Sequence, residues 1–393
     1  MISLCFVVES GTDVRLVEGL AKRFDLSIVA RRIEGGVEIS HPPSEAVPTV
    51  VGPASRLKFA LFLCRYLRAN RRQIDRVVVQ GYGPAALAAN LAGRLNGTPT
   101  AMLVCSPVEV YYRCRRTQPS AEKRFSRSEL FALQALARIN ALIGRQYIVL
   151  SRYLAGVVSR HGARGPVAVI PIYGIDTNVF APLSQTKATI RARLGLPTTG
   201  ALIFFSSRVA PEKDSETLLA AVSSLLDQGR DLWVLHRSGG YRRFMKDAER
   251  FGISSRVIAT DAVHPHQQLF LDYQASDLCV QASRAEGLGF SPLEALACEV
   301  PVIAAAVGGL KETIVDGQTG WTYPVGDPMA LARCIEVVLD DKVEAARCAA
   351  AGRKMVCERY DHQTVFAQFE RMTWQGEQIE LDELGRKRAS LPL

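Results

Sequence analysis

Two cationic side chains, Arg208 and Lys213, stand in a segment that could bind a diphosphate. They follow a strand predicted over Ala201–Ser206, within the sequence SSRVAPEKD. In a parallel sheet both residues would leave the carboxyl end of that strand, where open α/β sheets bind their ligands. Arginine offers a planar fork of donors and lysine a point charge, and both suit phosphate oxygens. The alternative is a solvated loop that only leads into the next helix.

A second segment, EGLGFSPLE, places seven residues between Glu286 and Glu294. Its two glycines would let a ligand approach the backbone closely. Pro292 marks a predicted helix start, whose free N–H groups favour a phosphate or sugar hydroxyls. Glu286 precedes the glycine loop, where a carboxylate would bind sugar hydroxyls. Glu294 has an alternative role, because Ser291-Pro292-Leu293-Glu294 fits a capping box in which the glutamate bonds only the cap N–H.

The segments that must position these side chains alternate between strand and helix patterns. In the first half, strands are predicted over 2–8, 26–30, 76–79, 100–104, 147–150 and 167–170, and helices over 13–23, 57–72, 84–95 and 128–143. In the second half, strands are predicted over 201–206, 232–236, 256–259, 278–281 and 302–305, and helices over 215–228, 245–251, 266–274, 292–298 and 328–340. This alternation predicts an α/β protein with two Rossmann-like, doubly wound parallel sheets and a cleft between the two domains.

The break between the halves is predicted at Pro171–Pro182, where Pro, Gly, Asp and Asn interrupt the periodicity. We therefore expect one domain over 1–175, a second over 176–360, and a C-terminal helix and tail over 361–393 that packs back on the first domain. A chain of 393 residues with 48% hydrophobic content can fill two cores.

The composition of the chain also indicates where in the cell the protein is expected. No stretch reaches the roughly 20 apolar residues that a membrane span needs. The start, MISLCFVVES, has the pattern of a first strand and lacks the basic region of a signal peptide. The nine cysteines form no CxxC pair, which is typical of reduced thiols. We expect a cytoplasmic protein, with a peripheral position at the inner face of the membrane as the alternative.

The net charge of +9 is concentrated in the first half of the chain. Residues 1–180 hold 24 Lys and Arg against 12 Asp and Glu, a net of +12, which leaves −3 for the remainder. A basic half indicates an anionic partner or simply a soluble surface. The helix predicted over Arg56–Arg72 could lie on an anionic membrane, or it could pack on its sheet like any Rossmann helix. No nucleic-acid motif accompanies the charge, so we expect no nucleic-acid partner.

The run from about Leu202 to Ala332 resembles the donor domain of the family 4 glycosyltransferases of the GT-B fold. The matching stretches are SSRVAPEKDSETLLAAV and ASDLCVQASRAEGLGFSPLEALACEVPVIAAAVGGLKETIVDGQTGWTYPVGDP. The resemblance implies a retaining transfer of a hexosyl unit from a nucleotide-diphosphate sugar, with a UDP-sugar favoured on frequency. The acceptor would be a glycan, a lipid-linked sugar or a small molecule. In that family the departing phosphate helps to deprotonate the acceptor, so no protein nucleophile is expected.

The resemblance also implies roles for individual residues. Arg208 and Lys213 would hold the donor diphosphate, Glu286 the sugar hydroxyls and Glu294 the ribose hydroxyls, and the first three are the candidate catalytic residues. Fixed cations aimed at the leaving diphosphate would stabilise the transition state. We find no Asp-x-Asp motif and no His/Cys cluster with ligand spacing, so we expect neither a metal nor another cofactor. The other donor-site candidates are Gly11, Ser207, Val263, Gly287, Leu288, Gly289 and Phe290.

Four features depart from the family pattern. Glu9–Thr12 has one glycine where the family's first loop usually has two, so Gly11 is either a phosphate contact or an ordinary turn residue. Val104–Pro107 lacks the histidine that often faces the donor sugar. Ser207 stands where a glycine usually precedes the arginine, and Asp214 follows Lys213 where glycine is common.

Acceptor recognition would come from the first half of the chain. Residues 81–86 match G-x-G-x-x-A, a weak dinucleotide signal because no acidic residue follows at the expected distance. We interpret this segment as an acceptor-side loop. Residues 106–123 combine aromatic and basic side chains in a predicted loop over the acceptor cleft. The acceptor candidates are Tyr82, Ser106, Glu109, Tyr111 and Arg113.

Two other functions fit parts of the same pattern. A GT-B-fold nucleotide-sugar epimerase or phosphorylase would use the same donor, and a product assay without acceptor would reveal it. A non-enzymatic nucleotide-sugar-binding scaffold would neither hydrolyse nor transfer any donor sugar. The combination of Arg208, Lys213, Glu286 and Glu294 favours the transferase over both.

Overall fold

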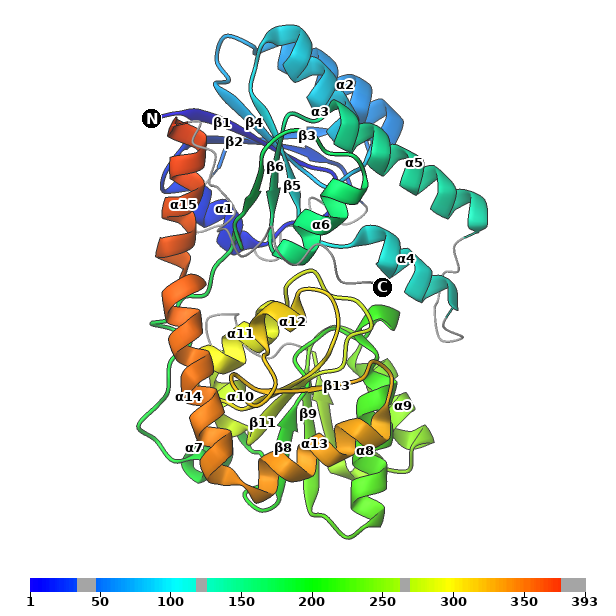
Figure 1. The fold of residues 1–393 in the computed structure, drawn as a ribbon, viewed down its shortest axis with the longest axis vertical. Coiled ribbons are helices and arrows are strands. Elements are labelled where there is room, and N and C mark those ends of the chain that lie inside the picture. Colours follow the sequence, from blue (N-terminus) through cyan, green and yellow to red (C-terminus); the bar gives the residue numbers. More distant parts are fainter. Residues whose placement is uncertain (34–46, 118–125, 262–268, 376–393) are drawn as a thin grey trace. The chain divides into compact units, whose positions relative to one another are not determined.

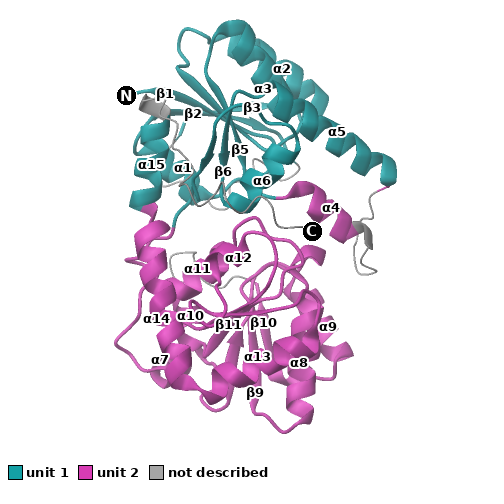
Figure 2. Ribbon diagram, viewed as in Figure 1, with its two compact units in different colours: residues 1–106, 127–174, 363–393 teal, residues 107–126, 175–362 magenta. Residues whose placement is uncertain are grey.

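The computed structural model describes residues 1–33, 47–117, 126–261 and 269–375 of the chain. It divides into two compact units (Figure 2). Unit 1 contains residues 1–106, 127–174 and 363–393, and unit 2 contains residues 107–126 and 175–362. Each unit is built on a parallel sheet with helices packed against it (Figure 1).

Unit 1 has a seven-stranded sheet in the order β3-β2-β1-β4-β5-β6-β7. Neighbouring strands pair in parallel. The inner strand β1 is apolar and buried along most of its length, as expected when helices cover both faces of a sheet. The strands are β1 (Ser3–Val8), β2 (Asp25–Arg31), β3 (Thr49–Gly52), β4 (Arg76–Gln80), β5 (Thr100–Val104), β6 (Gln146–Val149) and β7 (Val167–Val169). The helices are α1 (Val14–Ala21), α2 (Arg56–Ala69), α3 (Pro84–Asn96), α5 (Arg127–Ile143), α6 (Arg152–Arg160) and α15 (His362–Gln375).

The C-terminal helix α15 packs on unit 1. Phe369 meets Phe24 edge to face, with ring centroids 5.7 Å apart. Phe366 lies directly over Gly19 of α1, where a Cβ would come within 2.0 Å of the ring. Any side chain at Gly19 would therefore push the helix away.

Unit 2 has a six-stranded parallel sheet in the order β10-β9-β8-β11-β12-β13. Its core is formed by the apolar faces of the helices against the central strands. The strands are β8 (Ala201–Phe204), β9 (Leu232–Arg237), β10 (Val257–Thr260), β11 (Leu278–Gln281), β12 (Val302–Ala305) and β13 (Trp321–Tyr323). The helices are α4 (Val108–Thr117), α7 (Lys187–Leu194), α8 (Ser215–Asp227), α9 (Tyr241–Arg250), α10 (Phe270–Ala275), α11 (Phe290–Ala297), α12 (Leu310–Thr313), α13 (Pro328–Asp340) and α14 (Lys342–Arg359), with short 3₁₀ turns at η1 (Pro211–Lys213) and η2 (Ser254–Arg256).

Three predictions about the elements were wrong. Residues 108–117 form helix α4 where a loop was predicted, and α4 belongs to unit 2 although the predicted domain boundary placed it in the first domain. The reason is its packing against η1, which no local pattern reveals. The short strands β3 and β13 were missed because each has only three or four residues beside turn-forming ones. Helix α11 begins at Phe290, two residues before the predicted start.

Helix α2 packs on its sheet through Phe59, Leu63 and Leu67, all buried. Phe59, on the aromatic side of the predicted amphipathic helix, therefore faces the protein interior. Within the described ranges, no helix is both long and apolar enough to cross a membrane.

Candidate functional site

The two predicted cations lie together just after β8, each in contact with a glutamate. Arg208 donates from Nη2 to Oε1 of Glu212 at 2.7 Å, and its side chain is 54% exposed. Lys213 ends η1, and its Nζ bonds Oε2 of Glu286. The cation loop and the first glutamate of the Glu-x7-Glu pair, 73 residues apart in sequence, are thus joined in space.

Glu286 is held by a network of polar side chains. Its Oε2 accepts from Ser283 Oγ at 3.2 Å and from Gln281 Nε2 at 3.3 Å. Gln281 Oε1 in turn accepts from the hydroxyl of Ser207 at 3.0 Å. Three predicted donor-site residues, Ser207, Lys213 and Glu286, therefore belong to one hydrogen-bonded group at the carboxyl ends of β8 and β11.

The glycine loop between Glu286 and Glu294 packs against a second pair of glycines, Gly308 and Gly309. The Gly309 N–H donates to the Glu286 carbonyl at 3.1 Å, and a Cβ on Gly309 would lie 2.1 Å from the carbonyl oxygen of Gly287. Gly289 has φ +95°, and a Cβ there would meet Leu310 at 2.5 Å. Close backbone packing, which only glycine permits, therefore fixes the loop that carries the predicted backbone contacts.

Glu294 does not take part in the predicted capping box. Gly289 is the N-cap of α11, so Ser291 lies inside the first turn and cannot be the cap residue. Glu294 is buried and accepts from the Tyr273 hydroxyl at 2.9 Å, and that hydroxyl also lies 3.2 Å from Ser206 Oγ at the end of β8. The capping alternative is wrong, because the helix starts too early for it.

Asp214 explains why glycine is common at its position. Its φ and ψ are both 49°, in the left-handed region that glycine adopts most readily and that Asp and Asn tolerate. Its carboxylate accepts from Thr217 Oγ1 at 2.7 Å and lies 2.8 Å from Arg284 Nε. These contacts hold a turn that a glycine could adopt unaided.

Helix α4 brings further residues to the group. The Tyr111 hydroxyl is hydrogen-bonded to the backbone of Gly287. Burial, followed by the charges of Glu286 and Glu212, raises the pKa of Tyr111 well above its ordinary value. Two other acceptor candidates, Glu109 and Arg113, also lie on α4. Tyr111, predicted as an acceptor residue, therefore lies against the loop predicted to bind the donor.

The motif search missed Arg115 and Glu212. Arg115 donates from Nη2 to Oε1 of Glu212 at 3.0 Å and from Nε to Oε2 at 3.2 Å. Burial alone would raise the pKa of Glu212, but hydrogen bonds from Arg115 and from the backbone, with the charge of Arg208, outweigh it and lower that pKa. Arg115 is one of three arginines in YYRCRRT, and no local pattern singles it out.

The remaining predicted residues are dispersed. Gly11 lies between β1 and α1, and Ser106 follows β5, both in unit 1. Tyr82 is buried with its ring 5.8 Å from that of His161. The Ala85 N–H at the start of α3 donates to Glu9 Oε2 at 3.2 Å, so a carboxylate occupies the end where a dinucleotide phosphate would bind. Val263 lies outside the described residues, and Leu288 and Phe290 flank the Gly289 cap.

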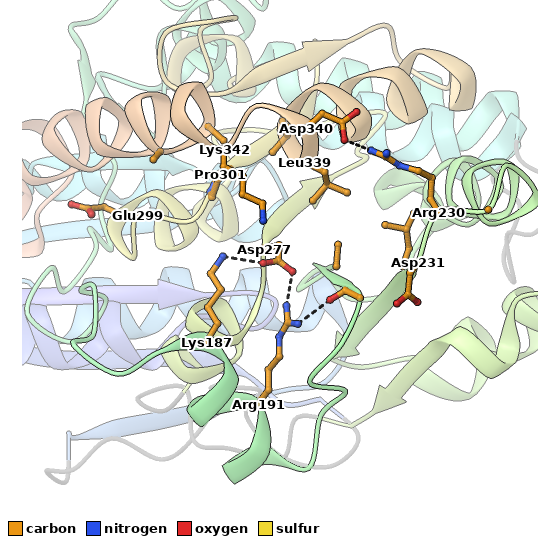
Figure 3. Close-up of a pocket in the computed structure, with 17 residues that line it drawn as sticks. Lys187, Arg191, Arg230, Asp231, Asp277, Glu299, Pro301, Leu339, Asp340 and Lys342 are labelled. Carbon is orange, nitrogen blue, oxygen red and sulfur yellow. Dashed lines mark hydrogen bonds and ion pairs between the residues drawn. The ribbon is translucent and has the colours of Figure 1, made fainter.

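A hollow of about 720 Å³ opens at the other end of the unit 2 sheet, near the starts of β8 and β9 (Figure 3). Its charged side chains largely pair with one another: Asp277 meets Lys187 and Arg191, and Arg230 meets Asp340 (Figure 3). Arg191 also donates to the carbonyls of Ala275 and Gly200. Lys187 and Arg191 thus join α7 to the sheet, and Arg230 joins the segment before β9 to α13.

The described residues hold no group of three or more His, Cys, Asp or Glu side chains placed to bind a metal ion. The polar group at the ends of β8 and β11 thus combines cations, carboxylates and backbone amides, a set that suits an anionic and hydroxylated ligand.

A protein-family model described as "Glycosyl transferases group 1" matches residues 186–355. The 2-deoxystreptamine glucosyltransferase of Streptomyces kanamyceticus is 31% identical over 280 residues, which cover 70% of each chain. The chain belongs to the group 1 glycosyltransferases. The family prediction is thereby confirmed, and the chain is a member of a hexosyltransferase family.

This group 1 glycosyltransferase is also 35% identical over 210 residues to the D-inositol 3-phosphate glycosyltransferase of Streptomyces avermitilis, a match that covers 50% of this chain and 45% of that protein. The matches to the first curated relatives thus span about half of their length. The solved structure of Anabaena HepE in complex with UDP-glucose is similar over 94% of this chain and 98% of that one, with a TM-score of 0.73 and 18% identity. The two parallel-sheet units and this likeness confirm the predicted GT-B fold.

Proposed function

We propose that the protein is a retaining, metal-independent transferase that moves a hexosyl unit from a nucleotide-diphosphate sugar to a glycan, lipid-linked sugar or small-molecule acceptor. The ion pair of Lys213 with Glu286 at the carboxyl ends of β8 and β11, with Arg208 on the same loop as Lys213, carries this proposal. A UDP-sugar is the favoured donor, in line with the UDP-glucose named for the structural neighbour.

The chemistry follows from the charges of this group. When the bond between the anomeric carbon and the phosphate oxygen breaks, negative charge develops on the leaving diphosphate. Arg208 and Lys213 would bind that charge, and the ammonium of Lys213 has three donors, so it can hold Glu286 and a phosphate oxygen together. The acceptor oxygen would then bond the anomeric carbon and pass its proton to the departing phosphate.

The carboxylates and the loop amides would orient the donor. Glu286 would accept hydrogen bonds from sugar hydroxyls, and Glu294, which shares the Tyr273 hydroxyl with Ser206, would receive the ribose hydroxyls. The amides from Gly287 to Phe290 would meet the sugar and phosphate at the start of α11. Tyr82, Ser106, Glu109, Tyr111 and Arg113 remain proposals for acceptor contacts.

The first test is thermal unfolding of the whole chain with UDP, GDP, ADP or CMP, with EDTA and with magnesium. We expect one nucleotide, UDP, to raise the melting temperature equally in EDTA and in magnesium, because binding to the folded state stabilises it. Stabilisation only with magnesium would contradict the metal-independent proposal. Stabilisation by a nucleotide other than UDP would replace the donor proposal.

Transfer itself separates this proposal from its alternatives. With the matching radiolabelled donor and a panel of sugar and lipid acceptors, the product should keep the anomeric configuration of the donor. An epimerised donor formed without acceptor would indicate the epimerase instead. Nucleotide binding without hydrolysis or transfer of any donor would favour the scaffold.

We further propose that the protein works at the inner face of a membrane and touches it through α2. The exposed side of α2 carries Leu57 and Leu61, which are 72% and 64% exposed. No acidic residue occurs in 56–73, and Arg65, Arg68, Arg71 and Arg72 line a surface hollow of about 700 Å³. Exposed leucines beside clustered arginines suit an anionic lipid surface rather than a free phosphate.

Vesicle sedimentation tests this surface. The protein should sediment with vesicles of phosphatidylcholine mixed with phosphatidylglycerol, less so with phosphatidylcholine alone, and less as salt is added. The double variants Arg68→Gln/Arg72→Gln and Leu57→Ser/Leu61→Ser should each weaken the binding several-fold. Val343→Ser, which changes an 83% exposed valine of unit 2, is the control. Equal vesicle binding by the wild type and all three variants, or no vesicle binding by the wild type, would refute the proposal.

A further inference from the structure

A buried carboxylate stands between the two cations proposed to bind the diphosphate. Glu212 belongs to η1, directly before Lys213, and its side chain has no exposed surface. Its Oε1 receives hydrogen bonds from both Arg208, at 2.7 Å, and Arg115, at 3.0 Å. Two arginines from segments almost a hundred residues apart therefore share one carboxylate.

The charge of this group depends on Arg115. Arg208 and Lys213 are balanced by Glu212 and Glu286, which gives no net charge for a diphosphate to meet. Arg115 adds one positive charge at the same place. A buried carboxylate with a single cationic partner would hold that partner tightly, because its burial is costly without full hydrogen bonding.

Arg115 is placed to satisfy the hydrogen-bonding capacity of the buried Glu212 carboxylate. It donates from two nitrogens to the two carboxylate oxygens, the bidentate arrangement that arginine makes and lysine cannot. Arg208 touches the carboxylate through one nitrogen only, and about half of its side chain is exposed to incoming ligand. The contact of Tyr111 with Gly287 holds α4 in place at the same side.

We propose that Arg115 is a positioning residue of the diphosphate site: because it makes two hydrogen bonds to Glu212, Arg208 makes only one and keeps its other nitrogens for the donor. This inference rests on the proposed function of Arg208. It assigns a donor-site role to α4, a segment that the sequence pattern linked to the acceptor.

The test is a rescue experiment with UDP as the probe. Arg115→Met should weaken UDP binding, measured by calorimetry, about tenfold, because Glu212 loses the two hydrogen bonds from Arg115 and holds Arg208 more tightly; tenfold corresponds to about 1.4 kcal/mol. Adding Glu212→Gln should restore the affinity to within about threefold of the wild type, since no buried charge then competes for Arg208. Arg115→Lys should fall between, because it keeps the charge without the fork.

Arg230→Met is the matched control: its side chain is 32% exposed against 33% for Arg115, and it forms one ion pair, with Asp340 at the other end of the sheet. It should leave UDP binding unchanged. Unweakened binding by Arg115→Met, or a double variant no better than Arg115→Met, would overturn the positioning role. If Arg208→Ala binds UDP as tightly as the wild type does, the proposed function of Arg208 is wrong. This inference, which rests on it, is then wrong too.

Discussion

Arg208→Ala is expected to lower the rate of glycosyl transfer by about 10²- to 10³-fold, the loss typical of removing one fixed donor to a developing negative charge. The substitution removes the guanidinium that lies at the exposed edge of the group, 2.7 Å from Glu212. Stability should change little, because Arg115 still satisfies the buried carboxylate through two hydrogen bonds. Initial rates with saturating acceptor and thermal unfolding of both proteins give the comparison.

The control for this variant is Arg250→Ala. Its side chain is 55% exposed, matching the 54% of Arg208, and it too pairs with a glutamate, Glu216, at 3.2 Å. It should retain the wild-type rate, because it ends α9 and pairs with Glu216 and Asp247 rather than with a residue of the polar group. Normal turnover by Arg208→Ala would contradict the diphosphate role and leave Arg208 only its ion pair with Glu212.

Glu286→Gln is expected to reduce kcat/KM for the donor by about 10²-fold, because a neutral amide replaces the carboxylate proposed to bind sugar hydroxyls. The amide can still accept from Ser283, so the loop should stay in place. Lys213 loses its ion-pair partner but keeps its charge. The affinity for the nucleotide alone should therefore hold or rise while the use of the nucleotide sugar falls.

An unchanged or higher affinity for the nucleotide, together with a lower kcat/KM for the nucleotide sugar, would identify a sugar-binding role for Glu286. A parallel loss of both affinities would instead indicate that Glu286 acts only by orienting Lys213. Glu358→Gln, which changes a 57% exposed glutamate of α14, should alter neither value. Kinetics with the sugar donor and calorimetry with the nucleotide separate the two outcomes.

Local sequence patterns were enough to predict most of the fold. The largely apolar runs that became β1, β4, β8 and β11 are buried parallel strands, and the alternation with helices predicted two sheets. Helix α4 could not be predicted in the same way. Its register against η1 depends on partners distant in sequence, and its aromatic and basic residues also fit a loop.

The residues of the candidate site also divide into those that local sequence patterns predicted and those that depend on the tertiary structure. Arg208, Lys213 and Glu286 were found from their residue types and their places after predicted strands, because parallel strands bring their carboxyl ends to one edge of a sheet. Glu294 was found too, but its capping alternative depended on a helix start that local signals placed two residues late.

By itself, then, the sequence determined the alternation of strands and helices, the two Rossmann-like domains and the residue types that face the proposed donor, since these follow from periodicity and spacing, whereas the GT-B fold was implied by the family resemblance. Only the tertiary structure decided that Arg115 meets Glu212 across 97 residues, and that Glu9 meets the start of α3 across 76. Both pairs bury a carboxylate, and the partner that satisfies a buried charge is set by packing, which short-range sequence patterns do not encode.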